Sequence, residues 1–526
     1  MFIYFLFIFI IFGLAFIEAF VRFITAFLKL YKTKFPFAIG FIPFFGHLNL
    51  IQSGKCPFTF STLGTAKTVC AFRGLHPCLI TSDPKLIKLI CIKYSNHFHS
   101  RMIDPLSPNP YHSSNIHIFG ARGQRWKRQR TIASSTLNTA QLRKMLPLIF
   151  EQTDDFIIYL SNYLFKQNLI SFSPNEFDIH SLFQQLTASI IGRCALGLGK
   201  NSFENPPKHF EFFKQIFGVE PSVAIDYETF QWIIPSIIKC FASITSIWKS
   251  KTPIDKFNDF IRELLKEENG KNNILQNLKK FETFDSCFLN TQNEDKGILN
   301  FDKVSKADKI NTDEIVSTIR FLSIAGFDTT ANTLSFACFL LAENPEKLEK
   351  VFKEIESLKD KKLDYDTLSK ANYINCVLLE TLRLFPHASM LQSRLTLTDC
   401  IIENEDDEIL IPYGVGILFD TWSIHRDPNY WGSDVNEFKP ERHLSGNTVL
   451  DNFIPFGVGP RKCIGMRFAL MEQKAILIEF FKHFTVKLPK GMSSKNLYIS
   501  LRNTGTIWSN NLKLIIEKRT YFPNPA

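Results

Sequence analysis

Apolar residues are densest at the start of the chain. The segment MFIYFLFIFIIFGLAFI has 17 residues without a charge, which is the lower end of the length of a membrane-spanning helix. It has no basic start and no small-residue cleavage site, so we expect a retained anchor over residues 1 to 30 rather than a signal peptide. Basic residues follow at Arg22, Lys29, Lys32 and Lys34. This positive flank predicts that the bulk of the chain lies on the cytosolic side.

After the anchor, helical spacing of apolar residues dominates, and it predicts one mainly α domain over residues 31 to 526 with a small β portion. Two regions read as strands: residues 68 to 82, a hairpin around Arg73-Gly74, and residues 401 to 419. The longest helix is expected from a cap at Asn311 or Thr312 to a stop at Pro345. The polar stretch between about 266 and 312 is expected to be a solvated surface excursion.

Composition narrows the class of protein. The net charge is +10, but lysine and arginine are spread along the chain, so we expect no nucleic-acid partner. The eleven cysteines form no C-x-x-C pair. That pattern argues against a disulfide framework or a zinc site and favours a reducing compartment.

One cysteine has an unusual setting. Cys463 lies in FGVGPRKCIG, residues 456 to 465, just before a long apolar helical run. It could be a buried structural thiol, a nucleophile or a metal ligand. No histidine lies in this segment to serve as a base, although distant ones stay possible. A glycine-rich turn into a helix would supply N–H groups to a thiolate, and a single thiolate ligand points to iron held by a haem.

Two further motifs fit such a cofactor. AGFDTT, residues 325 to 330, places poor helix formers inside the longest helix, with Asp328 and Thr329 as an acid and an alcohol for proton delivery. A close crossing of small residues is the structural alternative. Trp126 and Arg130 share a helix face at i,i+4, and with Arg394 and Arg461 they could bind a cofactor with two carboxylates. Taken singly, each of these four residues is more often a surface residue than a cofactor ligand.

A third motif indicates architecture. In ETLRLFP, residues 380 to 386, Glu380 and Arg383 are three residues apart and so share one helix face. A buried pair of this kind has to be fully hydrogen-bonded. Arg442, in the loop-rich run from 425 to 444, could complete the network. We read all three as structural.

Together these residues resemble the cytochrome P-450 family of haem-thiolate monooxygenases. The segments FGVGPRKCIG, AGFDTT, ETLR and WKRQR match its motifs in order, and the resemblance covers essentially the chain from residue 36. It implies the cytochrome P-450 fold with an N-terminal transmembrane helix and haem b as the cofactor. It also implies Cys463 as the axial iron ligand, Phe456 beside the thiolate, Asp328 and Thr329 for proton delivery, and propionate binding by Trp126, Arg130, Arg394 and Arg461.

The closest likeness is to the microsomal group that includes vertebrate drug- and steroid-oxidising enzymes. It implies insertion of one oxygen atom from O2 into a lipophilic substrate, a steroid, fatty acid or xenobiotic, with electrons from NADPH through a flavoprotein reductase. Such enzymes lie in the endoplasmic reticulum membrane, with a single-pass anchor in the lipid and a cytosolic catalytic domain. Lys462 and Arg467 could meet the reductase. Residues 102 to 120 and about 203 to 245 are expected to line the pocket.

Alternatives and one departure stay open. The first alternative is a haem-thiolate isomerase or dehydratase that acts on peroxides without a reductase. The second is a haem-binding sequestration or sensor protein without turnover. His443 stands where many family members carry an aromatic residue after P-E-R.

Overall fold

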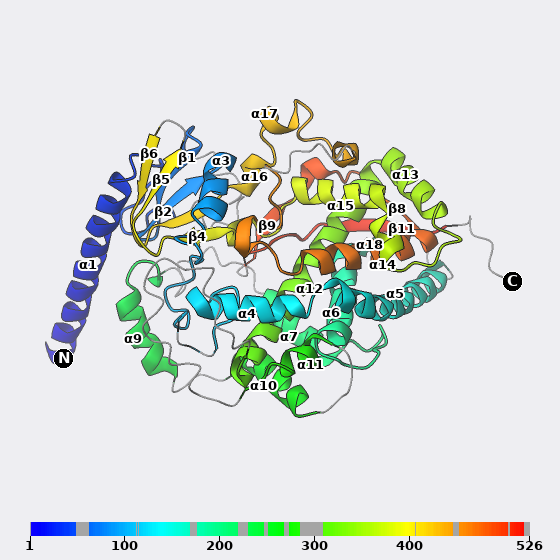
Figure 1. The fold of residues 1–526 in the computed structure, drawn as a ribbon, viewed down its shortest axis with the longest axis horizontal. Helices are drawn as coiled ribbons and strands as arrows, with labels where there is room; N and C mark the ends of the chain where they lie inside the picture. The colour runs from blue at the N-terminus through cyan, green and yellow to red at the C-terminus, as the bar shows by residue number, and fades with distance from the viewer. Residues whose placement is uncertain are drawn as a thin grey trace.

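The computed structural model describes most of the chain, and Figure 1 shows its fold as a ribbon. Described are residues 2–48, 63–111, 113, 115–168, 176–218, 230–246, 251–267, 273–283, 309–404, 407–444, 452–502 and 505–519. A small β region lies to one side in Figure 1, beside the N-terminal helix, and the larger helical region lies to the other. The fold is therefore mainly α with a small β portion, as the sequence predicts.

The first helix, α1 (Phe2–Tyr31), is continuous. The residues after the uncharged stretch thus extend the same helix instead of forming a separate one. Its segment Phe9–Tyr31 is long and apolar enough to cross a membrane, and only 11% of an 18-residue apolar window within it is buried against the rest of the protein. The helix Thr312–Glu343 passes the same test of length and composition but is mostly buried, as expected of a core helix.

The main sheet has four strands in the order β1-β2-β7-β4: β1 (Thr68–Arg73), β2 (His76–Thr81), β7 (Gly416–Phe419) and β4 (Ser393–Leu395). β1 and β2 form the predicted antiparallel hairpin, with Arg73 opposite His76. β2 runs parallel to β7. The predicted strands between 401 and 419 are confirmed as β7 and the hairpin of β5 (Cys400–Asn404) and β6 (Asp407–Ile411).

Among the described residues, two more small sheets accompany the main sheet and the β5–β6 hairpin. One joins β3 (Glu176–Asp178), β11 (Lys513–Lys518) and β8 (Phe484–Lys487), and the other pairs β9 (Ile499–Leu501) with β10 (Ile507–Ser509). The remaining helices are α3 (Pro84–Lys88), α4 (Gly123–Ser135), α5 (Thr139–Asn168), α6 (Ile179–Cys194), α7 (Lys208–Phe217), α9 (Pro235–Ser246), α10 (Pro253–Lys266), α11 (Ile274–Lys279), α12 (Thr312–Glu343), α13 (Pro345–Glu356), α14 (Tyr365–Ser369), α15 (Asn372–Leu384), α16 (Thr421–Ile424), α17 (Pro428–Trp431) and α18 (Met466–His483).

Helix α12 is the centre of the helical region, where it packs against α6, α15 and α10. It begins as predicted, because Asn311 and Glu314 form a capping box that satisfies the free N–H groups of the first turn. It ends before Pro345, which starts α13. Its apolar residues belong to one large core shared with α5, α6, α15 and α18.

The expectation of a solvated excursion between about 266 and 312 is wrong for the part that the structure describes. Residues 273 to 283 include helix α11, whose Ile274, Leu275 and Leu278 are buried in the main core. The few apolar residues of this polar stretch are spaced to share one helix face, so a low average hydropathy hid a packed element. Residues 268–272 and 284–308 lie outside the described residues.

Candidate functional site

The segment around Cys463 is a tight loop that leads into α18. The backbone N–H of Cys463 donates to the carbonyl of Phe456 at 2.7 Å, which closes the loop. Gly457 and Gly459 both have φ of 74°, a conformation that favours glycine. A Cβ at Gly459 would also collide with the carbonyl of Cys91. The two glycines of FGVGPR are therefore required by the turn that presents the thiol.

Cys463 faces a space inside the protein. Burial raises the pKa of its thiol, while the N–H groups of Gly465 and Met466 and the charges of Arg130 and Arg101 act to lower it. Yet the residue is accessible to solvent. A side chain that is surrounded by protein and still accessible to solvent lines an internal hollow.

The middle of α12 has a matching accessible face. Ala325, Gly326 and Thr329 are only partly buried, whereas Phe327, Asp328 and Thr330 beside them are buried. Phe321 lies on the same face, one turn earlier, and stacks on His117 with ring centroids 4.6 Å apart. This face supplies small residues where a ligand would need room.

Arginines gather beside Cys463 without acidic partners. Arg101, Arg394 and Arg461 are buried or partly buried. Burial lowers the pKa of Arg101 and of Arg461, and the like charges of Arg394 and Arg130 lower both further. Arg130 is close enough to influence the Cys463 thiol. Within the described part of the chain, none of them has a carboxylate within ion-pair distance. We call Arg101, Arg130, Arg394 and Arg461 the open cationic cluster.

Arg461 uses most of its N–H groups on the protein itself. Its guanidinium donates to the carbonyls of His99 at 2.6 Å, Ile118 at 3.1 Å, Phe119 at 3.3 Å and Ala121 at 2.5 Å. It also lies 4.0 Å above the Trp126 ring. Arg461 therefore holds the 99–121 segment and α4 against the cysteine loop, and contact with a cofactor stays a prediction for it.

The other predicted cations, Arg394 and Arg130, use fewer of their N–H groups on described parts of the protein than Arg461 does. Arg394, on β4, donates to the carbonyls of Ser393 at 2.8 Å and Val458 at 3.1 Å. Arg130 shares one face of α4 with Trp126, as their spacing predicts. The structure thus places Arg130 and Arg394 beside the cysteine loop that carries Arg461, with Trp126 stacked on the Arg461 guanidinium.

Sequence reasoning missed Arg101. Its guanidinium donates to the carbonyls of Leu391 at 2.6 Å and Arg461 at 2.9 Å, and its buried Nε has no hydrogen-bond partner. It lies in a loop without helix or strand, and its sequence neighbours give no signal. Only the tertiary fold brings it to the open cationic cluster.

Asp328 and Thr329 face different ways. The Thr329 hydroxyl donates to the carbonyl of Ala325 at 2.6 Å and lies on the accessible face of α12. Asp328 is fully buried on the other side. Its carboxylate accepts hydrogen bonds from Gln184 of α6 at 2.9 Å, Asn332 at 3.0 Å and Thr506 at 3.0 Å.

Two basic side chains complete the surroundings of Asp328. His180 Nε2 is 3.5 Å and Arg502 NH1 is 3.8 Å from Asp328 Oδ1. Burial alone would raise the pKa of Asp328, but the hydrogen bonds and charges from His180, Gln184 and Arg502 outweigh it and lower the pKa to about 2. The carboxylate is therefore ionised at neutral pH and joins α12 to α6 and to the β9–β10 turn.

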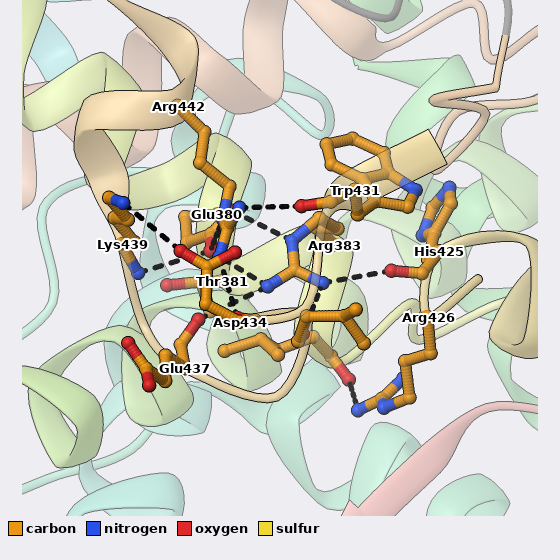
Figure 2. A network of polar contacts seen from close by, with 12 residues as sticks. Glu380, Thr381, Arg383, His425, Arg426, Trp431, Asp434, Glu437, Lys439 and Arg442 are labelled. Atoms are coloured by element: carbon orange, nitrogen blue, oxygen red, sulfur yellow. Dashed lines mark hydrogen bonds and ion pairs between the residues drawn. The ribbon is translucent and has the colours of Figure 1, made fainter. Parts of the chain in front are cut away.

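A second arginine-rich region, which we call the Glu380 network, is drawn in Figure 2. Arg383 donates to both Glu380 oxygens at 2.8 and 2.9 Å, and its other N–H groups bond the carbonyls of His425, Val435 and Glu437. Arg442 adds a bond to Glu380 at 3.3 Å and bonds the carbonyls of Trp431 and Asp434. The predicted structural network is confirmed.

The departure at His443 has a structural explanation. Its Nε2 lies 3.0 Å from Glu380 Oε2, and its ring packs against Trp431 and Phe453. Because a carboxylate only accepts, Nε2 donates this bond. His443 is a further member of the Glu380 network that retains the aromatic packing of its position.

Comparisons with known proteins agree with these features. The cytochrome P450 family model matches residues 38–509. Three Caenorhabditis elegans proteins named as cytochromes P450 are similar: CYP13A3, 31% identical with 85% of this chain and 87% of the relative covered, CYP13A7, 30% identical with 91% and 93% covered, and CYP13A1, 32% identical with 78% and 80% covered.

The chain belongs to the cytochrome P450 family. P450 enzymes are haem-thiolate monooxygenases, and the residues here fit a haem. Cys463 offers a thiol to an internal hollow, and α12 presents small residues to an accessible space. The open cationic cluster has no acidic partner among the described residues. A group with iron and two carboxylates would satisfy all three, with Cys463 as the metal ligand and the arginines beside its carboxylates.

Proposed function

We propose that this P450 is a membrane-anchored monooxygenase that inserts one oxygen atom from O2 into a lipophilic substrate, using electrons from NADPH through a flavoprotein reductase. The observation that carries the proposal is the placement of Cys463 on an internal hollow beside four arginines that have no acidic partner in the described part of the chain. Haem b, when bound, would supply dioxygen activation. The protein's own residues bind and orient the cofactor, admit the substrate and handle protons.

The two sides of the hollow have different tasks. Cys463 is the metal ligand, and Trp126, Arg130, Arg394 and Arg461 form the proposed cofactor-binding set, with Arg101 added from the structure. Phe456, whose carbonyl fixes the Cys463 N–H, is proposed to pack beside the thiolate. Across the hollow, α12 and the aromatic pair Phe119 and Phe321, with ring centroids 5.5 Å apart, supply apolar surface. Such a lining favours a steroid, a fatty acid or an apolar xenobiotic.

Thr329 and Asp328 are the proposed proton-delivery pair. The Thr329 hydroxyl is on the accessible face of α12 and can pass a proton toward the hollow. Asp328 is ionised on the opposite face of α12, so we propose that it takes part in proton delivery through its contact with His180. Replacement of Thr329 by Ala should increase oxygen consumption that yields no product, whereas Asp328→Asn should reduce the turnover rate and change its solvent isotope effect.

The reductase would meet the face next to the cysteine loop. Lys462 and Arg467 are both exposed there, on either side of the segment that carries the thiol. Exposed cations near the site where electrons enter suit an acidic partner. We also propose that α1 anchors the protein in the endoplasmic reticulum membrane, with the catalytic domain cytosolic.

Reconstitution tests this function. Purified full-length protein in phospholipid discs would be mixed with a microsomal flavoprotein reductase, NADPH and a panel of steroids, fatty acids and apolar xenobiotics under 18O2. The proposal predicts reductase-dependent product with one 18O atom. Conversion of a peroxide without reductase would instead establish an isomerase or dehydratase. Bound haem with neither activity across the panel would favour a sequestration or sensor protein and contradict the proposal.

A further inference from the structure

The helix α1 has one stripe of residues that faces the protein. Ala19, Phe23, Ala26 and Leu30 follow a 4-3-4 spacing, and Ala26 is only 2% exposed. They share apolar clusters with residues of β1 and β2. Small residues on such a stripe let two elements approach closely. The second half of α1 is therefore packed on the main sheet, beside which Figure 1 shows it.

Aromatic rings reinforce this packing. Phe23 contacts Phe72 of β1 and Phe41 of the following segment, with ring centroids 5.8 and 5.5 Å apart. Phe27 stacks on Phe37 at 5.2 Å. The chain after α1 therefore folds back on the helix and on β1 together, and part of the high phenylalanine content serves this contact.

The polar residues of α1 lie next to the packed stripe, where they meet the domain. Glu18 accepts a hydrogen bond from Arg22 at 2.9 Å and from the backbone N–H of Ser236, in the first turn of α9, at 3.2 Å. Lys29 Nζ donates to the carbonyl of Tyr413 at 2.8 Å. A charged residue is costly in hydrocarbon, but here each has a partner in the protein.

We propose that α1 is divided: residues 2–17 enter the bilayer, and residues 18–31 are a docking helix that lies outside the hydrocarbon and fixes the catalytic domain at the lipid surface. This inference rests on the membrane attachment proposed above. Residues 2–17 rise about 24 Å, close to the ~30 Å of a bilayer core. The membrane anchor is thus continuous with a helix that is packed on the domain, and no flexible linker joins the two.

The outward face fits a phospholipid surface. Phe20, Val21, Ile24 and Leu28 are apolar and exposed on the docking helix. Exposed Phe44 precedes the sheet, and exposed Phe241 is on α9. Because Glu18 bonds the first turn of α9, the docking helix also holds α9 on this side of the molecule. That places the 230–246 segment, part of the expected pocket region, next to lipid, from which a lipophilic substrate would come.

Thiol labelling tests the division of α1. Single substitutions Phe12→Cys, Val21→Cys and Leu28→Cys would be made at exposed positions in the full-length protein, in phosphatidylcholine discs. Reaction with a membrane-impermeant maleimide would be quantified at each site by mass spectrometry and normalised to the denatured protein. We expect Val21→Cys and Leu28→Cys, which lie at the level of the hydrated head groups, to react at least tenfold faster than Phe12→Cys, which lies in the hydrocarbon. Equal protection of all three would contradict the division, and equal fast reaction would contradict membrane attachment itself.

A matched pair of tryptophan variants tests the docking. Ala26→Trp places a large ring in the buried stripe, whereas Ile24→Trp places the same ring at a position that is 40% exposed. In the same discs, Ala26→Trp should increase hydrogen exchange in Thr68–Thr81 and in the first turn of α9, and Ile24→Trp should leave both unchanged. Identical exchange in the two variants would overturn the docked arrangement.

Discussion

The Glu380 network and the open cationic cluster both contain buried arginines. The two regions differ in the hydrogen-bond and ion-pair partners of these arginines. In the Glu380 network, Arg383 places all its N–H groups on a carboxylate and three carbonyls. In the open cationic cluster, Arg101 leaves a buried Nε without a partner. Among the described residues, no carboxylate lies within ion-pair distance of the four arginines of the open cationic cluster.

The difference separates structure from binding. A buried ion pair with all its hydrogen bonds made locks an element of the fold. A group of buried like charges without a counterion lowers stability until an anion arrives. The first arrangement belongs to the framework that supports the cysteine loop, and the second to the site itself.

The largest expected effect comes from breaking the Glu380 network. Arg383→Met should lower the free energy of unfolding by roughly 3–5 kcal/mol, because it leaves the Glu380 carboxylate buried without its main partner. Urea unfolding followed by circular dichroism would measure it. If the variant does not accumulate folded, Arg383→Lys, which keeps a charge but not the fork of donors, should still unfold at lower urea than the wild type. Wild-type stability in both variants would refute the structural role.

Acid should weaken the same network. Burial alone would raise the pKa of Glu380, but bonds from Arg383 and His443 lower it to about 2 from a reference of 4.5. This stabilisation is fully present above about pH 4.5 and is lost as the pH falls toward about 2, in total about 3 kcal/mol. Urea unfolding from about pH 6 down to about pH 3.5 should therefore show a steeper loss for wild type than for Glu380→Gln. Parallel curves would show that Glu380 does not carry this dependence.

The open cationic cluster should respond in the opposite way. Arg130→Met removes an unpaired, partly buried cation, so the apoprotein should be as stable as wild type or more stable. The dissociation constant for haem should rise roughly tenfold, because a charge-assisted contact is lost. Haem titration and apoprotein unfolding measure the two effects.

A control lies on the same helix. Arg128 pairs with Glu314 at 2.8 Å, so Arg128→Met should lower stability and leave haem affinity near wild type. If Arg130→Met destabilised the apoprotein as Arg128→Met does, the distinction between the two kinds of arginine would fail.

The smallest effect is expected at His443. His443→Phe keeps an aromatic ring at this position but removes one donor to Glu380, so stability should fall by about 1 kcal/mol. His443→Gln, which keeps an N–H donor, should retain more of it. The urea midpoints of the two variants decide this, and a Phe variant as stable as wild type would show that packing alone matters here.

The sequence predicts those parts of the molecule that depend on local pattern. The β1–β2 hairpin, the capped helix α12 and the pairing of Glu380 with Arg383 follow from turn residues, cap residues and helical spacing. The cysteine loop follows from its glycines. These features are decided within a few residues of the chain.

Features that depend on distant parts of the chain were not predicted. Arg101 reaches the site from a loop without a pattern, and Arg461 spends its donors on the carbonyls of the 99–121 segment. Asp328 and Thr329 are adjacent, yet helix geometry places them on different faces, and the partners of Asp328 come from α6 and the β9–β10 turn. Helix α11 was hidden by the polar composition around it. In each case tertiary contacts decide the role.

The central claim is that Cys463 presents the thiolate that binds haem iron, and a spectrum tests it directly. The ferrous carbon monoxide difference spectrum of the full-length, haem-loaded protein would be compared with those of Cys463→Ala and of Cys240→Ser, which changes an exposed cysteine. We predict the thiolate-type Soret band in wild type and in Cys240→Ser, and its loss in Cys463→Ala. Absence of this band in folded, haem-loaded wild type, or its persistence in Cys463→Ala, would contradict the account.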